Sequence, residues 1–347
     1  MSHKLRAGVI GLGVGEQHIA GYRRAVNVEV VALCDLDPEK RAMASAKYPG
    51  CAVYADAQEV ISAPDIDVVS IASFDNHHAA QIVQALNLGK HVFCEKPLCT
   101  TEAELRDIRS AIERNPGTRL STNTILRMSP RFRDLHGRIR RGEMGQIYYA
   151  EADYNYGRLH KLKEGWRGSI ADYSVMLGGG IHMVDLLLWL SGRRVVEVSA
   201  AGNKICSAGY NFATPDMVVA ILRFDNGMLG KVAANFGCVY PHFHKLSVYG
   251  TEATFENGRE TASLYNSRDR DTPDIGKIDT AYPGIEKGDL IPGFIDAIRG
   301  TGSAEIGESE VFATMEVCLA IDRSLREGAP VRIGDQGQLQ VDTVRMP

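Results

Sequence analysis

The sequence predicts an α/β fold with two parts: a doubly wound parallel sheet at the N-terminus, then an α+β domain with a large, open-faced, mainly antiparallel sheet. Three observations carry this prediction. Short apolar runs alternate with helical patterns over the first third of the chain, as in parallel sheets with crossover helices. A glycine-rich loop follows the first apolar run. Beyond residue 125 strand patterns succeed one another directly, which favours antiparallel pairing.

Length and composition narrow the class of protein. A chain of 347 residues is long enough for two domains with hydrophobic cores. Its net charge of −4 argues against nucleic acid or an anionic membrane as a partner. The seven cysteines include no Cys-x-x-Cys pair, which predicts reduced thiols in the cytoplasm and no metal site. No membrane span is expected, since the most apolar helical segment, Ile181–Leu190, is too short to cross a bilayer.

The N-terminal segment has the order of a dinucleotide-binding βαβ unit. The strand Leu5–Ile10 leads into a glycine loop, a helix and a second strand, Val28–Leu33. Glycines in such a loop let backbone N–H groups approach a pyrophosphate at a helix N-terminus. Asp35 follows the second strand, roughly 20 residues beyond the loop, where a carboxylate accepts hydrogen bonds from a ribose diol. The predicted cofactor contacts in this unit are Gly11, Gly13, Val14, Gly15 and Asp35.

Charged residues near this loop bear on the cofactor. Asp35 is expected to repel a 2′-phosphate and so to favour NAD, while Lys40 and Arg41 leave NADP as an alternative. Glu16 stands where the G-x-G-x-x-G spacing places its third glycine. A carboxylate there suits the helix dipole but repels a pyrophosphate placed close by.

The rest of the first domain continues the alternation. Further strands are expected at Ala52–Tyr54, Val68–Ser73, His91–Cys94 and Arg119–Ile125, and helices at Pro38–Tyr48, His77–Leu88 and Glu102–Arg114. We therefore expect a dinucleotide-binding domain over residues 1–124. Residues 125–347 are expected to form a substrate-binding and oligomerisation domain.

A lysine closes the strand His91–Cys94, which runs into Glu95-Lys96-Pro97. Proline has no N–H and restricts the residue before it, so the strand pairing must stop there. Lys96 then stands at the carboxyl end of a strand, where open α/β sheets bind their ligands. Glu95 is placed to keep the ammonium charged or to fix its direction. A surface salt bridge at a strand end is the alternative interpretation.

The second domain combines a basic amphipathic helix with consecutive strands. The helix is expected at Ser129–Arg141, the strands at Ile147–Tyr156, Val195–Ile205, Met217–Phe224 and Met228–Phe236, and two closing helices near 288–299 and 308–327. Asp225-Asn226-Gly227 between the last two strands is a hairpin signal. An antiparallel sheet can leave one face uncovered, and an apolar free face predicts a homodimer or homotetramer formed through this sheet.

Several motifs spread over the chain together resemble the Gfo/Idh/MocA oxidoreductases. They are Gly11-Leu12-Gly13, Asp35-Leu36-Asp37-Pro38, Gly89-Lys90-His91-Val92, Glu95-Lys96-Pro97, Gly142-Glu143-Met144-Gly145, Gly180-Ile181-His182-Met183-Val184-Asp185 and Gly293-Phe294-Ile295-Asp296-Ala297-Ile298. The resemblance implies an N-terminal Rossmann domain, a C-terminal open-faced sheet domain, NAD(P), and a sugar, cyclitol or related polyol as substrate. It also implies a cis peptide before Pro97 and a catalytic Lys96 beside the nicotinamide.

His182 and Asp185 are the remaining expected catalytic residues. They stand at i and i+3 of a predicted helix and so share one face. An imidazole is the usual group for taking a proton from an alcohol at neutral pH, although a buried structural pair is the alternative. Many members of the family carry an aspartate four residues before this histidine, where this chain has Gly178. The candidates to replace it are Asp172, Tyr173 and Asp185.

The loop Ser73–His78 departs from the family's Pro-Asn loop, although His78 falls where the family places a histidine. Helix capping by Asp75 or Asn76 explains this loop equally well. The resemblance adds Ser73, His78, Glu95 and Lys96 to the expected cofactor contacts.

Candidate substrate contacts gather at the start of the second domain. With His182 they are Arg127, Tyr156, Trp166 and Arg167, near Arg158 and His160 in sequence. Arginine, tyrosine and tryptophan suit a polyhydroxylated or anionic ligand through bidentate bonds and ring stacking, although a solvated loop with one anchoring tryptophan has the same composition. Tyr240, His242 and His244 are candidates for a second wall of the pocket. No metal site is expected among these histidines.

The sequence thus predicts an NAD(P)-dependent dehydrogenase that oxidises a secondary alcohol of a sugar, cyclitol or related polyol. One alternative is an NAD-dependent glycosidase or epimerase in which the cofactor is recycled. Another is a non-catalytic dinucleotide or sugar sensor on the same fold. Lys96 and His182 argue against the sensor, while Gly178 keeps it open.

Overall fold

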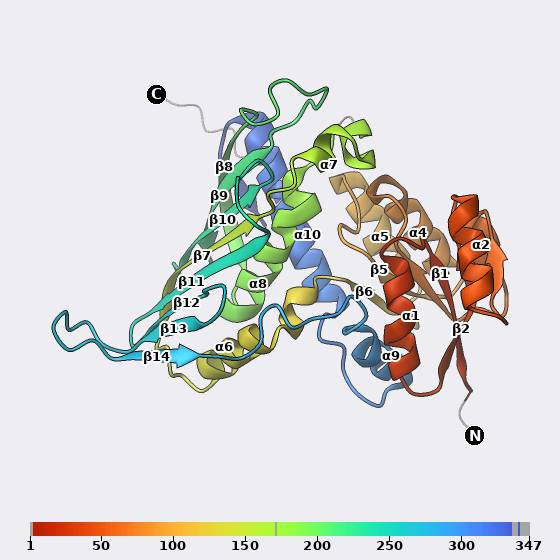
Figure 1. The fold of residues 1–347 in the computed structure, drawn as a ribbon, viewed down its shortest axis with the longest axis horizontal. Helices are drawn as coiled ribbons and strands as arrows, with labels where there is room; N and C mark the ends of the chain where they lie inside the picture. The colour runs from red at the N-terminus through yellow and green to blue at the C-terminus, as the bar shows by residue number, and fades with distance from the viewer. Residues whose placement is uncertain (1–2, 171, 335–338, 341–347) are drawn as a thin grey trace. The chain divides into compact units, whose positions relative to one another are not determined.

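The computed structural model describes residues 3–170, 172–334 and 339–340 (Figure 1). The chain forms two compact units. Unit 1 comprises Met1–Ile125 and Ile285–Met315, and unit 2 comprises Leu126–Gly284 and Glu316–Pro347. The sequence placed a single boundary after residue 124. In the structure the chain returns to unit 1 at residue 285, so neither unit is one continuous stretch.

Unit 1 is built on a six-stranded parallel sheet in the order β3-β2-β1-β4-β5-β6. Its strands are β1 (Leu5–Ile10), β2 (Val28–Cys34), β3 (Ala52–Tyr54), β4 (Val68–Ile71), β5 (His91–Cys94) and β6 (Leu120–Thr122). This is the strand order of a dinucleotide-binding Rossmann fold, with its crevice where the order reverses, at β1 and β4. The predicted doubly wound parallel sheet is therefore confirmed.

The register of these strands brings three loops to one edge of the sheet. Ile10 pairs with Ile71, and Ile71 pairs with Cys94. Because parallel strands in register end together, the glycine loop after β1, the loop after β4 and Glu95-Lys96-Pro97 after β5 leave the sheet side by side.

Helices cover the sheet of unit 1. They are α1 (Gly15–Arg24), α2 (Pro38–Lys47), α3 (Ala57–Ser62), α4 (His78–Asn87), α5 (Glu102–Arg114) and α9 (Ile291–Arg299), and α10 (Glu308–Glu327) contributes to both units. The segment 285–315 completes the core: Phe294 of α9 packs on Phe93 of β5 with ring centroids 5.7 Å apart. Gly21 of α1 and Gly288 meet backbone to backbone, so a Cβ on either would overlap the other.

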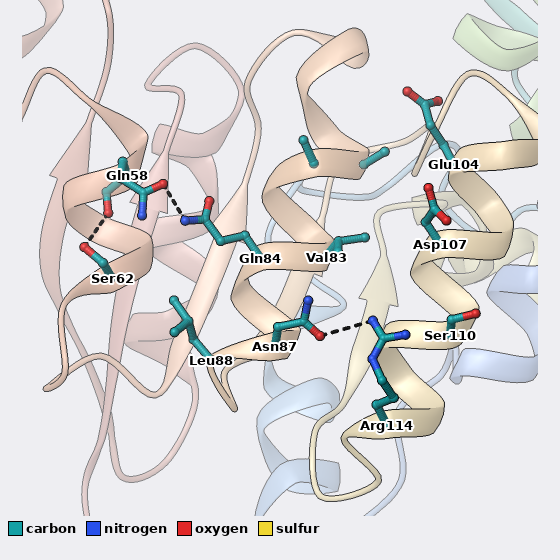
Figure 2. Close-up of a pocket in the computed structure, with 12 residues that line it drawn as sticks. Gln58, Ser62, Val83, Gln84, Asn87, Leu88, Glu104, Asp107, Ser110 and Arg114 are labelled. Atoms are coloured by element: carbon teal, nitrogen blue, oxygen red, sulfur yellow. Dashed lines mark hydrogen bonds between the residues drawn. The ribbon is translucent and has the colours of Figure 1, made fainter.

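A shallow groove marks the outer helices α3, α4 and α5 of unit 1 (Figure 2). Gln84 donates to Gln58 across it, and Arg114 donates to Asn87 at 3.4 Å. None of the site residues predicted from the sequence is among the described residues that line it. The groove is thus separate from the loops at the carboxyl ends of the strands.

Unit 2 contains a ten-stranded sheet in the order β14-β13-β12-β11-β7-β10-β9-β8-β15-β16. The strands are β7 (Ile147–Asn155), β8 (Val195–Asn203), β9 (Met217–Phe224), β10 (Leu229–Asn235), β11 (Phe243–Gly250), β12 (Thr254–Glu256), β13 (Ala262–Tyr265), β14 (Ile275–Ile278), β15 (Val331–Ile333) and β16 (Leu339–Gln340). Neighbouring strands are antiparallel except β7 and β10, which are parallel. The predicted large, mainly antiparallel sheet is confirmed.

Helix α8 lies against β7 and β10 on one face of this sheet (Figure 1). The helical segments of unit 2 are α6 (Pro130–Arg140), α7 (His160–Lys163), η3 (Trp166–Ser169), a π-helical turn η4 (Met176–Gly180) and α8 (Ile181–Ser191), with η2 (Ile125–Met128) at its start. Eight of the eleven residues of α8 are buried, and the helix is apolar on most sides. No described helix is long and apolar enough to cross a membrane.

The opposite face of the sheet is mixed in character. Along β7 the buried side chains alternate with half-buried ones, as in a strand with one covered face. On the uncovered side Lys231 bonds to Asp153 at 2.7 Å and to Glu151 at 3.3 Å, and the rings of Tyr149 and Tyr249 stack at 5.4 Å. This face carries ion pairs as well as aromatic surface.

Candidate active site

The glycine loop of unit 1 leaves space at the N-terminus of α1. Gly11 has φ +87°, and a Cβ there would overlap the carbonyl of Ala72, so the loop passes close to the end of β4. Beside Gly13, in contrast, no described atom lies within 4 Å of the position of a Cβ. A tight loop with an open centre at a helix N-terminus fits a pyrophosphate.

The carboxylate of Glu16 is paired with other side chains, so it does not produce the repulsion of a pyrophosphate that the sequence suggested. Its Oε1 accepts hydrogen bonds from Lys47 Nζ at 2.7 Å and from the Tyr48 hydroxyl at 3.0 Å. The hydrogen bond from Lys47 lowers the pKa of Glu16, so the carboxylate is ionised and paired with an ammonium of α2. The departure from the glycine spacing is therefore compatible with a bound anion.

Asp35 is fixed by backbone donors. Its Oδ2 accepts from the N–H of Leu12 at 2.6 Å and its Oδ1 from the N–H of Asp37 at 2.9 Å. A carboxylate offers about four acceptor positions, which leaves capacity for the two hydroxyls of a ribose. Lys40 Nζ lies 3.6 Å from the carboxylate, and Arg41 donates to the carbonyl of Asp35 at 2.9 Å. The two cations that left NADP open in the sequence thus lie beside Asp35.

The loop after β4 is joined to the lysine motif by a buried histidine. His78 Nδ1 lies 2.7 Å from the carbonyl oxygen of Pro97, and its Nε2 lies 3.1 Å from that of Ser73. The Ser73 hydroxyl donates to Gln81 at 2.7 Å. The peptide between Lys96 and Pro97 is cis, as the family resemblance implied. His78 thus bridges the two loops from a fully buried position.

Glu95 is the centre of a buried polar network. Its Oε1 accepts from Asn123 Nδ2 at 2.7 Å and lies 3.2 Å from His18 Nε2, and His18 Nδ1 lies 2.8 Å from the Ser70 hydroxyl. Burial raises the pKa of Glu95, but the hydrogen bond from His18 and the charges of Lys287 and Lys96 outweigh it and hold that pKa well below its usual range. The network fixes the backbone that carries Lys96, which is half-buried.

Sequence reasoning missed His18 and Asn123 in this network. His18 stands at i+3 from Gly15 on α1, on the face that the helix turns to the sheet. A histidine on a buried helical face was the available signal. Asn123 follows β6 at the same edge of the sheet as Glu95, which only the strand order reveals.

In unit 2 the carboxylate of Asp185 is held by Arg127. Arg127 Nη2 donates to Oδ1 at 2.7 Å and Nε to Oδ2 at 2.9 Å, and the side chains are 2% and 1% exposed. This is a bidentate ion pair in the core, a geometry that only arginine provides. Arg127 was expected to contact substrate, and the structure gives it this second role. The catalytic role expected of Asp185 stays a prediction.

His182 lies in an aromatic cluster. The Tyr154 ring is stacked 6.0 Å from the imidazole, and the rings of Tyr156 and His244 lie 5.5 Å from the Tyr154 ring. Phe236, His242, Trp166 and Tyr173 continue the cluster. Three predicted substrate contacts, Tyr156, Trp166 and His182, thus come together here. Tyr240 is instead exposed and packs on Phe243 at 6.3 Å.

The glycines before His182 make room for these rings. A Cβ on Gly179 would overlap the Tyr154 ring, and a Cβ on Gly178 would overlap the Tyr173 hydroxyl. Arg167 Nε donates to that hydroxyl at 3.0 Å, and its guanidinium lies 4.4 Å from the centroid of Trp166. The phenol of Tyr173 thus fills the space beside Gly178, the position where the family resemblance implied an aspartate. Asp172, another candidate replacement, is exposed.

Two stretches of the chain match families of known proteins. Residues 5–123 match an oxidoreductase family with an NAD-binding Rossmann fold, and residues 132–256 match the GFO/IDH/MocA C-terminal domain. The inositol 2-dehydrogenase of Salmonella paratyphi B is 32% identical over 256 residues, which cover 73% of each chain. The chain belongs to the Gfo/Idh/MocA oxidoreductase family.

Other proteins resemble this family member over nearly its whole length. The scyllo-inositol 2-dehydrogenase (NAD+) of Bacillus subtilis is 26% identical over 350 residues, covering 96% of this chain and 97% of the relative. Levoglucosan dehydrogenase, solved in complex with NADH, shares the fold with a TM-score of 0.83 at 22% identity, covering 95% of this chain and 99% of that one. By its family, the chain is an NAD(P)-dependent oxidoreductase.

No group of three or more His, Cys, Asp or Glu side chains within the described residues is arranged to hold a metal ion.

Proposed function

We propose that this oxidoreductase oxidises a secondary alcohol of a sugar, cyclitol or related polyol with NAD as cofactor. The observation that carries the proposal is His182 in a cluster of aromatic rings on the unit that follows an NAD-binding domain. Aromatic faces pack on the C–H faces of polyols, and an imidazole accepts the proton of an alcohol. The names of the inositol 2-dehydrogenases similar to this chain support the substrate class.

Each motif then has a role. NAD, when bound, supplies the hydride acceptor. Lys96 donates a hydrogen bond to the alcohol oxygen, and His182 accepts the hydroxyl proton as the C–H bond gives up its hydride. The hydrogen bonds of His18 and Asn123 to Glu95 fix the neighbouring backbone and so position Lys96. The Tyr173 hydroxyl, with Arg167 beside it, stands in for the aspartate that this chain lacks at Gly178.

The test is a panel of neutral sugars and cyclitols, each with NAD and with NADP, followed by the absorbance of the reduced cofactor. Lys96→Met should keep cofactor binding by calorimetry and lose at least about a hundredfold in turnover. Lys4→Met, an exposed lysine of the same unit, is the control and should be unchanged. Near-normal turnover of Lys96→Met would remove the lysine from the mechanism.

The alternatives leave different traces in the same panel. A glycosidase or epimerase would convert its substrate without net accumulation of NADH, which product chromatography detects. A sensor would bind NAD and sugar and convert neither.

We also propose a cytoplasmic homo-oligomer assembled through the uncovered face of the ten-stranded sheet. The stacked Tyr149 and Tyr249 on that face support an interface, and the cysteines of the described residues are all free thiols. Sedimentation equilibrium tests the assembly, and a monomer at working concentration would refute it.

A further inference from the structure

Three cations of unit 2 lie against the aromatic cluster, two of them on the ring of one buried phenol. Arg158, just after β7, has its guanidinium 4.9 Å from the centroid of the Tyr156 ring, and Lys161 of α7 has its ammonium 5.9 Å from it. Arg167 of η3 has its guanidinium 4.4 Å from the centroid of the neighbouring Trp166 ring, and its charge acts on Tyr156. Tyr156 itself is only 7% exposed. The segment that follows β7 thus points its positive charge at the aromatic cluster around His182.

Two of these cations have no carboxylate partner. Within the residues that the structure describes, neither Arg158 nor Lys161 forms an ion pair with an acidic side chain. The contrast within the same unit is Lys231, which pairs with both Glu151 and Asp153. Glu164, the acidic residue nearest to Lys161 in sequence, is exposed. Positive charge is therefore left uncompensated at this place.

This positive charge affects the pKa of Tyr156 inside the aromatic cluster. Burial raises the pKa of Tyr156, but the charges of Arg167 and Lys161, with the polar groups of Lys161 and Arg158 beside the phenol, outweigh burial, so the pKa lies below its ordinary value. A buried phenol normally shifts the other way, as Tyr154 does next to it. The cations therefore prevail over desolvation at this point, and an anion would be favoured there.

Only the ring of Tyr154 separates Tyr156 from His182, the proposed base, along this row of rings. The Tyr154 ring stands 5.5 Å from the ring of Tyr156 and 6.0 Å from that of His182. A ligand that spans this short row of rings can bring an alcohol to His182 and a charged group to the cations.

We propose that Arg158, Lys161 and Arg167 form a subsite for an anionic group, a carboxylate or a phosphate, on the polyol that this enzyme oxidises. This inference rests on the proposed function and specifies its substrate as an acidic sugar or cyclitol. Guanidinium groups bind either anion in bidentate fashion, and the lysine adds a point charge.

The experiment measures affinity in matched pairs by calorimetry on the full chain with NAD present. Glucose is compared with glucuronate and with glucose 6-phosphate, galactose with galacturonate, and myo-inositol with an inositol monophosphate. We expect at least one acidic member to bind about tenfold or more tighter than its neutral partner, with an advantage that falls as salt is added. The carboxylate and phosphate arms tell which anion the subsite accepts.

Variants separate this subsite from a general charge effect. Arg158→Gln combined with Lys161→Gln should bring the acidic-to-neutral affinity ratio close to one. Lys245→Gln is the matched control, since it removes one positive charge from the uncovered face of the sheet and should preserve the ratio. A wild-type ratio within about twofold for every pair, no binding by any acidic member, or a ratio unaffected by the double substitution would overturn the inference.

Failure of this inference is distinguishable from failure of the proposed function. If neutral polyols reduce NAD and acidic ones bind no tighter, the proposed dehydrogenase activity is supported and the anion subsite is refuted. If acidic ligands bind selectively but no polyol of the panel reduces NAD, the subsite stands and the dehydrogenase falls.

Discussion

The two units hold their functional side chains by different means. In unit 1, Asp35 and Glu95 are fixed by hydrogen bonds, the first from backbone N–H groups at the edge of the parallel sheet, the second from His18 and Asn123. In unit 2, His182 is surrounded by rings, and glycines let those rings approach. Hydrogen-bonded sites follow from strand order and register, whereas ring-packed sites depend on shapes that meet only in the folded chain. Four substitutions probe this difference.

The largest expected effect is on the buried pair of unit 2. Arg127→Met leaves the Asp185 carboxylate in the core without its bidentate partner, and we expect a loss of about 3–5 kcal/mol in the free energy of unfolding. Urea denaturation measures it. The double variant Arg127→Met with Asp185→Leu should recover much of that loss, because it removes the stranded charge as well. If Arg127→Met is nearly neutral, packing and not charge holds this part of unit 2.

Removing the charge of a second carboxylate of unit 2, Asp322, should raise the free energy of unfolding. Asp322 accepts a hydrogen bond from Ser174 at 2.8 Å, and burial raises its pKa from the ordinary 3.8 to about 6. The folded state therefore holds this proton more tightly than the unfolded state, and ionisation at neutral pH lowers stability. At about 1.36 kcal/mol for each pKa unit the penalty is roughly 3 kcal/mol, less what residual water access screens.

Asp322→Asn should accordingly stabilise the protein by roughly 1–3 kcal/mol at pH 7. The gain should shrink as the pH falls below about 6 and vanish only below 3.8, where the wild-type carboxyl is protonated in both states. Urea titrations across this pH range follow it. A gain that is the same at every pH would assign the effect to something other than ionisation.

Gly178 tests the packing of the aromatic cluster. In Gly178→Ala the new methyl would overlap the Tyr173 hydroxyl, and we expect a loss of about 1–3 kcal/mol together with slower turnover. Gly209→Ala is the matched control, since no described atom lies within 4 Å of the position of its Cβ. Combining Gly178→Ala with Tyr173→Leu should cost less than the sum of the two single changes. Strict additivity would mean that the two residues do not compete for one space.

The smallest effect is expected at the cofactor loop of unit 1. Lys40 lies 3.6 Å from Asp35 and is largely exposed, so Lys40→Gln should weaken NADP binding only about threefold and leave NAD binding nearly unchanged. Calorimetry with each cofactor measures both. Stronger binding of NADP by the variant would show that Lys40 does not serve the 2′-phosphate.

Much of unit 1 was readable from the sequence because its signals are local. Proline after Lys96, glycines after β1 and an acid after β2 each constrain the backbone where they stand, and with the alternating helices they predict the parallel sheet that the structure shows. The sequence did not predict strands β11–β15 of unit 2 or helix α3 of unit 1, because short strands and helices leave little periodicity in sequence. The pairing of Arg127 with Asp185 joins residues far apart in the chain. No local sequence pattern predicts this ion pair.

The return of the chain to unit 1 constrains the order of folding. Residues 285–315 supply Phe294 against Phe93 and the close approach of Gly288 to Gly21, yet they are made long after the parallel strands. A ribosome that has released only the first 125 residues has therefore produced a sheet whose core is still open on one side. Until α9 emerges, the side of Phe93 that Phe294 covers is open, and the nascent domain is a client for chaperones through most of its own synthesis.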